Sequence, residues 1–238
     1  MRGVWKDIKS LDPRATAALL VTAVVLLLLE FKGQASAWRM QPWLRERYPF
    51  PKDLDWASQV AWALSAAVLL GLGPFLFAVL GMRMKPRDFG FRWRGFVRHL
   101  PLYMALYVLM VPLIWWASTR PSFLQTYPFP HLARENARAF WMWEAVYLLQ
   151  FAALEMFFRG FLVFSLERRF GLHGIFVMVI PYAMIHLHKP MPEAFGAIGA
   201  GILLGYLALR TRSFYGGILL HFGVALTMDL LARGARGP

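Results

Sequence analysis

Residues 100–118 read LPLYMALYVLMVPLIWWAS, nineteen residues without a charged side chain. At the helical rise of about 1.5 Å per residue, this run nearly spans the roughly 30 Å hydrocarbon core of a bilayer. Six further apolar runs surround it, at 15–31, 56–82, 139–166, 175–186, 194–209 and 214–231. We therefore predict an all-α fold, a polytopic transmembrane helix bundle of about seven spans.

Several runs contain residues that bend helices. Gly71, Gly73 and Pro74 in the second run and Pro112 in the third predict bends rather than breaks, because apolar sequence continues on both sides. Pro181 is expected to kink the fifth run, which is the shortest.

The sixth run carries small residues at small-x-x-x-small spacing, namely Gly196, Gly199, Ala200, Gly201 and Gly205. Such spacing lets the backbone of a second helix approach closely inside a membrane. We interpret this stripe as a packing feature rather than a catalytic one.

The composition supports a membrane environment and excludes some chemistries. Hydrophobic residues make up 58% of the 238 residues and charged residues 16%, against about 45 to 50% and 25% in soluble domains. The net charge of +13 comes from basic residues in short segments between apolar runs, so we predict a lipid bilayer as partner and no nucleic acid. The chain has no cysteine. Catalysis would therefore fall to Glu, Asp, His or hydroxyl groups.

The loop charges predict a topology with a cytoplasmic N-terminus in the plasma (inner) membrane. In that orientation fourteen basic residues lie in inner segments and eleven in outer ones, and the densest cluster, Arg83 to Arg98, is inside. Alternatively, residues 1–37 form a cleaved signal peptide, since Ala35-Ser36-Ala37 has the form of a cleavage site. An anchoring first helix explains the same residues. We predict one membrane domain with a three-span region at 1–138 and a four-span core at 139–238.

Ionisable residues within the spans point to a functional site, because a charge at the bilayer centre costs roughly 2.5 to 3.5 kcal/mol. Glu155 and Arg159 lie four residues apart on one helical face, where an ion pair is possible; a purely structural bridge is the alternative. His186 closes the fifth run, and His221 and Asp229 in the seventh face roughly the same way.

The expected depths of these residues differ. At helical rise, Glu155 lies about 18 Å from the inner basic clusters, His221 about 13 Å and His186 about 25 Å. Their convergence therefore requires helix tilt and a kink at Pro181. Glu144, near the start of its run, is interpreted as a carboxylate that a helix N-terminus stabilises.

Five motifs in order resemble the CPBP family of intramembrane proteases: Glu155 to Gly160 (EMFFRG), Tyr182 to His186, Gly201 to Tyr206 (GILLGY), Arg210 to Ser213, and His221. This family, also called Abi, includes type II CAAX prenyl endopeptidases and bacteriocin-processing or immunity proteins. The resemblance covers Glu144 to Asp229 well. It implies that residues 139–238 are a catalytic core, with Glu155, His186 and His221 as catalytic residues and Arg159 and Tyr182 in support.

The chain departs from the family pattern at two positions that are normally polar. Leu154 stands where the first of two glutamates is expected, and Ala225 where asparagine or aspartate follows a histidine by four residues. The leading glutamate usually activates water, so we expect Glu155 to take that role. We further expect Asp229 to replace the polar group missing at Ala225.

These residues predict an intramembrane endopeptidase that hydrolyses a peptide bond of a membrane-associated or lipid-modified protein. Glu155 would act as general base, His186 would share the attacking water and His221 would stabilise the oxyanion. Alternatively, the same three residues hold a catalytic zinc, as in a metalloprotease. A second class is a non-catalytic relative, such as a membrane partner or immunity-type protein. A proton-coupled transporter is a third, although the halves show no inverted repeat.

Overall fold

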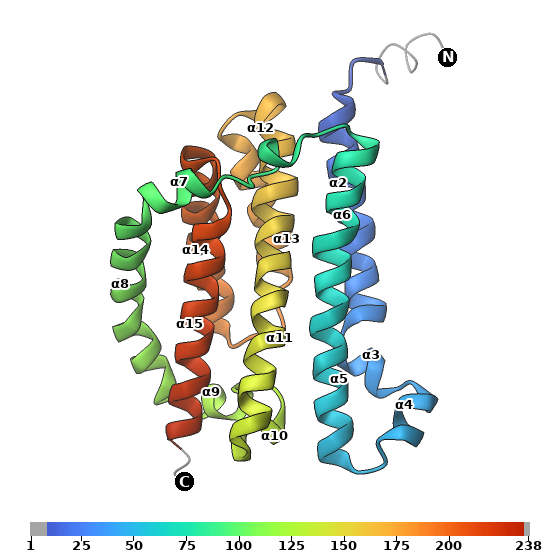
Figure 1. The fold of residues 1–238 in the computed structure, drawn as a ribbon, viewed down its shortest axis with the longest axis vertical. Coiled ribbons are helices and arrows are strands. Elements are labelled where there is room, and N and C mark those ends of the chain that lie inside the picture. Colours follow the sequence, from blue (N-terminus) through green and yellow to red (C-terminus); the bar gives the residue numbers. More distant parts are fainter. Residues whose placement is uncertain (1–8, 236–238) are drawn as a thin grey trace.

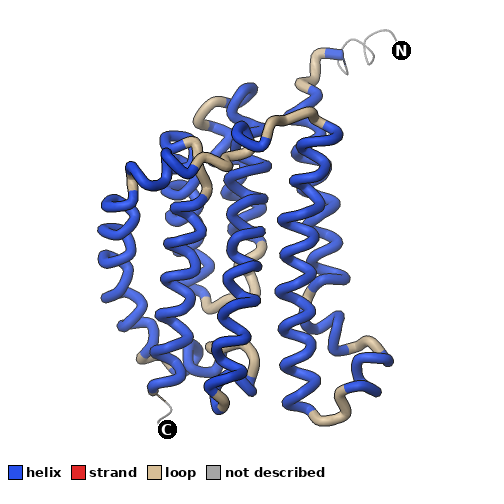
Figure 2. The backbone as a smooth tube through the Cα atoms, viewed as in Figure 1, coloured by secondary structure: helices blue, strands red, loops and turns tan. Residues whose placement is uncertain are grey.

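The computed structural model describes residues 9–235, in which all regular structure is helical (Figure 2). Within this range six helices are long and apolar enough to cross a membrane: Pro13–Arg47, Pro51–Gly81, Leu100–Ser118, Ala137–Phe170, Met191–Thr211 and Tyr215–Gly234. A shorter apolar helix covers His173–Met184. The predicted bundle of about seven spans is thus confirmed. Arg2, Lys6 and Arg236, which entered the topology prediction, lie outside the described residues, as does the start of the 1–37 segment.

The first two spans are continuous helices with local irregularities. Their elements are α2 (Pro13–Leu28), η1 (Leu29–Gly33), α3 (Ala35–Arg39), α4 (Pro42–Arg47), α5 (Pro51–Ala66), η2 (Ala67–Leu72), α6 (Gly73–Leu76) and η3 (Phe77–Gly81). Helix α2 starts where Asp12 Oδ1 accepts a hydrogen bond from the Ala15 amide at 2.8 Å, with Pro13 at the first helical position. In the second span, wide π-helical turns surround Gly71, Gly73 and Pro74, so the helix continues past them.

The remaining elements are η4 (Pro86–Asp88), α7 (Trp93–Arg98), α8 (Leu100–Ser118), α9 (Pro121–Thr126), α10 (His131–Glu135), α11 (Ala137–Glu155), η5 (Met156–Val163), α12 (Phe164–Phe170), α13 (His173–Met184), α14 (Met191–Thr211) and α15 (Tyr215–Gly234). Helix α7, α12 and the start of α2 lie at one end of the bundle, and α4, α9 and α10 lie at the other (Figure 1). We call these the α12 end and the α10 end.

The span formed by α11, η5 and α12 is the centre of the bundle. In its most apolar stretch 72% of the residues are buried, against at most 33% in the other five long helices. Helix α5 and η2 pack against α11, α15 packs against both α11 and α8, and η5 contacts α13 and α14. Polar side chains on the central span are therefore surrounded by protein rather than by lipid.

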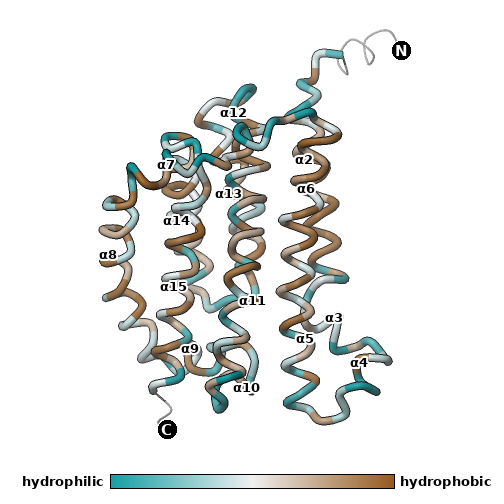
Figure 3. Tube along the Cα trace, viewed as in Figure 1, coloured by the Kyte–Doolittle hydropathy of each residue, from teal (hydrophilic) through white to brown (hydrophobic). Residues whose placement is uncertain are grey.

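The outer faces of the helices are apolar. Leu20, Leu80 and Leu109 are 64%, 74% and 68% exposed, and hydrophobic residues cover the spans while hydrophilic ones gather toward the ends (Figure 3). A large apolar surface of this kind is stable when hydrocarbon is the solvent. The chain is an integral membrane protein.

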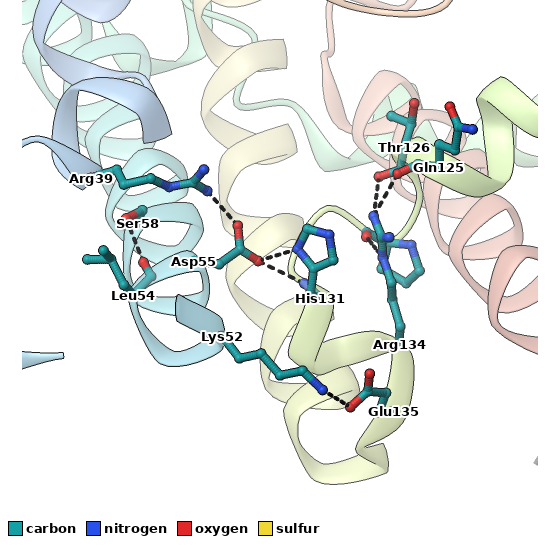
Figure 4. A network of polar contacts seen from close by, with 11 residues as sticks. Arg39, Lys52, Leu54, Asp55, Ser58, Gln125, Thr126, His131, Arg134 and Glu135 are labelled. Atoms are coloured by element: carbon teal, nitrogen blue, oxygen red, sulfur yellow. Dashed lines mark hydrogen bonds and ion pairs between the residues drawn. The ribbon is translucent and has the colours of Figure 1, made fainter. Parts of the chain in front are cut away.

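A polar network at the α10 end ties the N-terminal helices together (Figure 4). Asp55 on α5 accepts a hydrogen bond from Arg39 Nη2 at 2.6 Å and from the backbone amide and Nδ1 of His131 at 2.9 Å. Lys52 and Glu135 form an ion pair at 2.7 Å beside it. Helices α3, α5 and α10 are thereby joined. The boundary that we place between residues 138 and 139 stays a prediction.

Part of the glycine stripe on α14 meets α13. A Cβ on Gly201 would lie 3.0 Å from the Tyr182 ring, and one on Gly205 would lie 2.9 Å from the Ile175 side chain. Gly196 and Gly199 have no neighbouring atoms within 4 Å of that position. The predicted close approach is confirmed for the second half of the stripe, where it packs α14 against Tyr182.

Candidate active site

A buried ion pair lies at the junction of α11 and η5. Arg159 Nη1 donates to Glu155 Oε1 at 2.9 Å, and neither side chain has any exposed surface. The four-residue spacing predicted that this pair was possible, and the structure contains it. Removing one partner of such a pair costs about 3 to 5 kcal/mol, because the other charge remains buried alone.

The imidazole of His221 on α15 contacts the same carboxylate. His221 Nδ1 lies 2.9 Å from Glu155 Oε1, and because a carboxylate only accepts hydrogen bonds, Nδ1 is the donor; in the neutral imidazole Nε2 is then an acceptor. Glycine makes this approach possible. A Cβ on Gly217, one turn before His221, would stand 2.1 Å from Glu155 Oε2.

Tyr182 on α13 connects His221 to a third helix. Its hydroxyl lies 3.3 Å from His221 Nε2 and donates to that nitrogen when the imidazole is neutral. The Tyr182 ring also lies 4.4 Å from the guanidinium carbon of Arg159, a cation–π distance. Glu155, His221 and Tyr182 therefore form one hydrogen-bonded chain across α11, α15 and α13.

His186 reaches the same place from the turn after α13. Its Nδ1 donates to the backbone carbonyl of Tyr182 at 2.7 Å, so that its Nε2 is also an acceptor. The ring centroid of Tyr182 lies 4.8 Å from that of His186 and 6.2 Å from that of His221. The prediction that His186 closes the fifth helix is wrong by two residues. The helix ends at Met184, and the amides of His186 and Leu187 bond to carbonyls three residues back rather than four.

Some polar atoms of the ion pair have no partner among the described residues. Glu155 Oε2 and Arg159 Nε and Nη2 are buried without a hydrogen bond. Each such group costs about 1 to 3 kcal/mol. A polar molecule that bonded to them would offset this cost, which favours a binding role over a purely structural bridge.

The donor set does not fit a metal ion. Within residues 9–235 no group of three or more His, Cys, Asp or Glu side chains is close enough to hold one. Glu155 Oε1 already accepts two hydrogen bonds, and the positive Arg159 beside it opposes a second cation. The zinc alternative therefore has no support in this arrangement of side chains.

Asp229 does not join His221. Asp229 Oδ2 instead accepts a hydrogen bond from Trp143 Nε1 at 3.2 Å, and Trp143 lies twelve residues, or about 18 Å of helix, before Glu155. Helix α15 runs antiparallel to α11, so each turn after His221 moves away from Glu155. Glu144 lies well inside α11, 2% exposed, rather than at the helix N-terminus where we expected it.

The two positions that depart from the family pattern are packed with apolar side chains. Leu154 is 7% exposed and belongs to the main apolar core of the bundle. Ala225 is equally buried, in a cluster that includes Tyr147 and Phe151. A polar group at either position would lie among apolar side chains.

One residue beside the site was not found from the sequence. The ring of Phe151 stacks on His221, with centroids 4.9 Å apart and planes 22° apart. Phe151 precedes Glu155 by four residues, and Tyr147 and Trp143 continue the same spacing along α11. This i, i+4 series is the signal that could have identified Phe151.

Residues 136–227 match the family model described as type II CAAX prenyl endopeptidase, Rce1-like. The resemblance inferred from the order of the motifs is thereby confirmed for this part of the chain. No curated protein and no solved structure matches the chain. The Rce1-like region contains Glu155, Arg159, Tyr182, His186 and His221, and it supports the protease class. Asp229 and the first three spans lie outside it.

Proposed function

We propose that the protein is an intramembrane endopeptidase in which Glu155 and His221 together activate water. The observation that carries this proposal is the hydrogen-bonded chain from Glu155 through His221 to Tyr182, buried where α11, α15 and α13 meet. The Rce1-like match over these three helices supports the choice of peptide-bond hydrolysis.

The exposure of the two side chains supports different roles for them in this proposal. Glu155 is 0% exposed, whereas the His221 side chain is 17% exposed. Water therefore reaches His221 more easily than the Glu155 carboxylate. We therefore propose His221 Nε2 as the general base, in place of Glu155, which the sequence led us to expect. Glu155 would keep the proton on His221 Nδ1 and stabilise the imidazolium that forms.

The proposed reaction has two steps. His221 Nε2 takes a proton from water while the hydroxide attacks the carbonyl carbon of the substrate, and the Tyr182 hydroxyl turns from Nε2 to donate to the oxyanion. The carbon–nitrogen bond then breaks as the imidazolium returns its proton to the leaving amine. His186 Nε2 accepts a hydrogen bond from the same water, and Arg159 positions Glu155.

The place of the site supports a substrate class. The site lies on helices that are long and apolar enough to cross a membrane, and the matching family model is described as a type II CAAX prenyl endopeptidase. We therefore propose a membrane-associated or lipid-modified protein as substrate, with the N-terminus cytoplasmic and the protein in the plasma (inner) membrane. Since the chain lacks cysteine, single cysteines at Arg94 and Arg45 can test this topology with an impermeant maleimide. Only the Arg45→Cys variant should react in intact cells.

A non-catalytic relative is the second candidate, and the observation that favours it is Leu154. This residue fills the leading glutamate position and is packed in the apolar core. In that case the Glu155–Arg159 pair would be a structural bridge only.

Substitution of Glu155 by glutamine separates the two candidates. We expect Glu155→Gln to lower kcat/KM by about 10² to 10⁴ for a quenched fluorescent prenylated peptide in proteoliposomes. The matched control is Glu144→Gln, the same chemical change at a buried position of the same helix that does not contact His221. The control should keep wild-type activity.

The membrane proteomes of cells that express wild type or Glu155→Gln provide a test that needs no chosen substrate. A protease predicts uncleaved precursors that accumulate only with Glu155→Gln. Identical proteomes, together with unchanged peptide cleavage, would favour the non-catalytic relative and refute the proposal.

A further inference from the structure

A second polar site lies at the α12 end of the bundle, away from the proposed active site. It is a cavity of about 400 Å³ whose walls include five arginines: Arg14, Arg87, Arg92, Arg168 and Arg212. They come from the start of α2, from η4 and the loop that follows it, from α12, and from the residue that ends α14. Figure 1 shows the start of α2, α12 and the loop before α7 together at this end.

The arginines are only partly neutralised. The cavity also contains Asp88 and Glu167, so its lining carries a formal excess of three positive charges. Asp88 forms an ion pair with Arg92 at 3.4 Å, and Glu167 forms one with Arg212. In the described part of the chain Arg14 and Arg168 have no ion pair or hydrogen bond through their guanidinium groups. Two guanidinium cations in the lining of the cavity therefore remain available to a ligand.

Arg212, in the wall of the cavity, has an unfavourable backbone conformation. Its φ of 55° and ψ of 32° lie in the left-handed region, where glycine ends a helix more easily. The Arg212 guanidinium is fixed by Glu167 and lies 5.9 Å from the ring of Phe164. Strain of this type is common where a side chain has a function. It supports a site in which the arginine itself is needed.

The lining fits a phosphate group. Guanidinium groups donate paired hydrogen bonds to phosphate oxygens, and several converging arginines select an anion with many acceptors. The residues that line the cavity lie at the α12 end, where the hydrophobic spans give way to hydrophilic loops along the backbone (Figure 3). Lipid headgroups lie at this level, and basic pockets between membrane helices bind them. Phe164 and Met84 supply an apolar wall for the part of the lipid next to the phosphate.

We propose that this cavity binds a phosphate group, and that an anionic phospholipid headgroup supplies it. Scattered loop charges that only orient the protein would not need a cavity. Arg94 and Arg98 on α7 are such charges, because both are exposed and neither lines the cavity. They provide a matched control for the loss of two positive charges.

The test compares Arg14→Gln/Arg168→Gln with Arg94→Gln/Arg98→Gln in detergent. Thermal unfolding is followed by fluorescence of the ten tryptophans, with added phosphatidylglycerol, phosphatidylcholine or inorganic phosphate at constant ionic strength. We expect phosphatidylglycerol to raise the Tm of the wild type and of the α7 variant. The cavity variant should bind it at least about tenfold more weakly. Phosphatidylcholine and inorganic phosphate should have no effect.

Three results would overturn the proposal. Equal stabilisation of both double variants by phosphatidylglycerol would show a diffuse charge effect, and no stabilisation of the wild type would show that there is no site. Stabilisation by inorganic phosphate alone would overturn the lipid as its source. If the cavity variant fails to fold, Arg14→Lys/Arg168→Lys keeps the charge but loses the paired hydrogen bonds. This lysine double variant should then retain less phosphatidylglycerol than the wild type in native mass spectrometry.

Discussion

Gly217→Ala tests the contact between α15 and α11 that assembles the proposed site. The new methyl group would stand 2.1 Å from Glu155 Oε2, whereas ordinary contact begins near 3.4 Å, so the two atoms must separate by about 1.3 Å. A displacement of that size turns the 2.9 Å hydrogen bond between Glu155 and His221 into a gap of about 4 Å. We expect a loss of about 1 to 3 kcal/mol of stability from overpacking. Cleavage should fall about 100-fold from the misplaced pair.

The assay is paired measurement of Tm and kcat/KM in detergent, with Gly223→Ala as the control. Gly223 lies on the same helix, and its methyl group would stand 3.2 Å from the Tyr107 ring, which needs a shift of only a few tenths of an ångström. The control should therefore keep its activity and nearly all of its stability. Wild-type Tm and activity in Gly217→Ala would refute the close packing of Glu155 against α15, and with it the proposed pair.

Three further predictions concern other residues. Leu154→Glu, which restores the glutamate of the family pattern, should lower stability by about 2 to 4 kcal/mol, because it places a carboxyl group in the apolar core; a Tm at or above that of the wild type would contradict this. Asp229→Asn should leave the cleavage rate unchanged, since Asp229 bonds to Trp143 rather than to His221, and a large loss of kcat would restore Asp229 to the site. The hydrogen bond from Lys52 lowers the pKa of Glu135 below its ordinary value of 4.5. The small contribution of the Lys52–Glu135 ion pair to the free energy of unfolding is therefore present above pH 4.5 and lost as the pH falls further. In Glu135→Gln this part of the decrease of Tm at acid pH should be absent.

The membrane fold follows from the sequence because burial in hydrocarbon is a local property. A run such as 100–118 is apolar along its whole length, and its backbone groups can be satisfied only within its own helix. The irregular helical turns around Gly71, Gly73 and Pro74 are local in the same sense. The Glu155–Arg159 pair was also predictable, since four residues bring two side chains together on any helix.

The site as a whole was decided by packing between helices. Estimated depths left Glu155, His221 and His186 several ångströms apart, and only the tertiary structure shows that Tyr182 lies between the two histidines. The antiparallel arrangement of α11 and α15 likewise sends Asp229 to Trp143, although spacing along one helix pointed it toward His221. Contacts within a helix depend on spacing alone. Contacts between helices depend on tilt, direction and small residues such as Gly217, which spacing along the chain does not report.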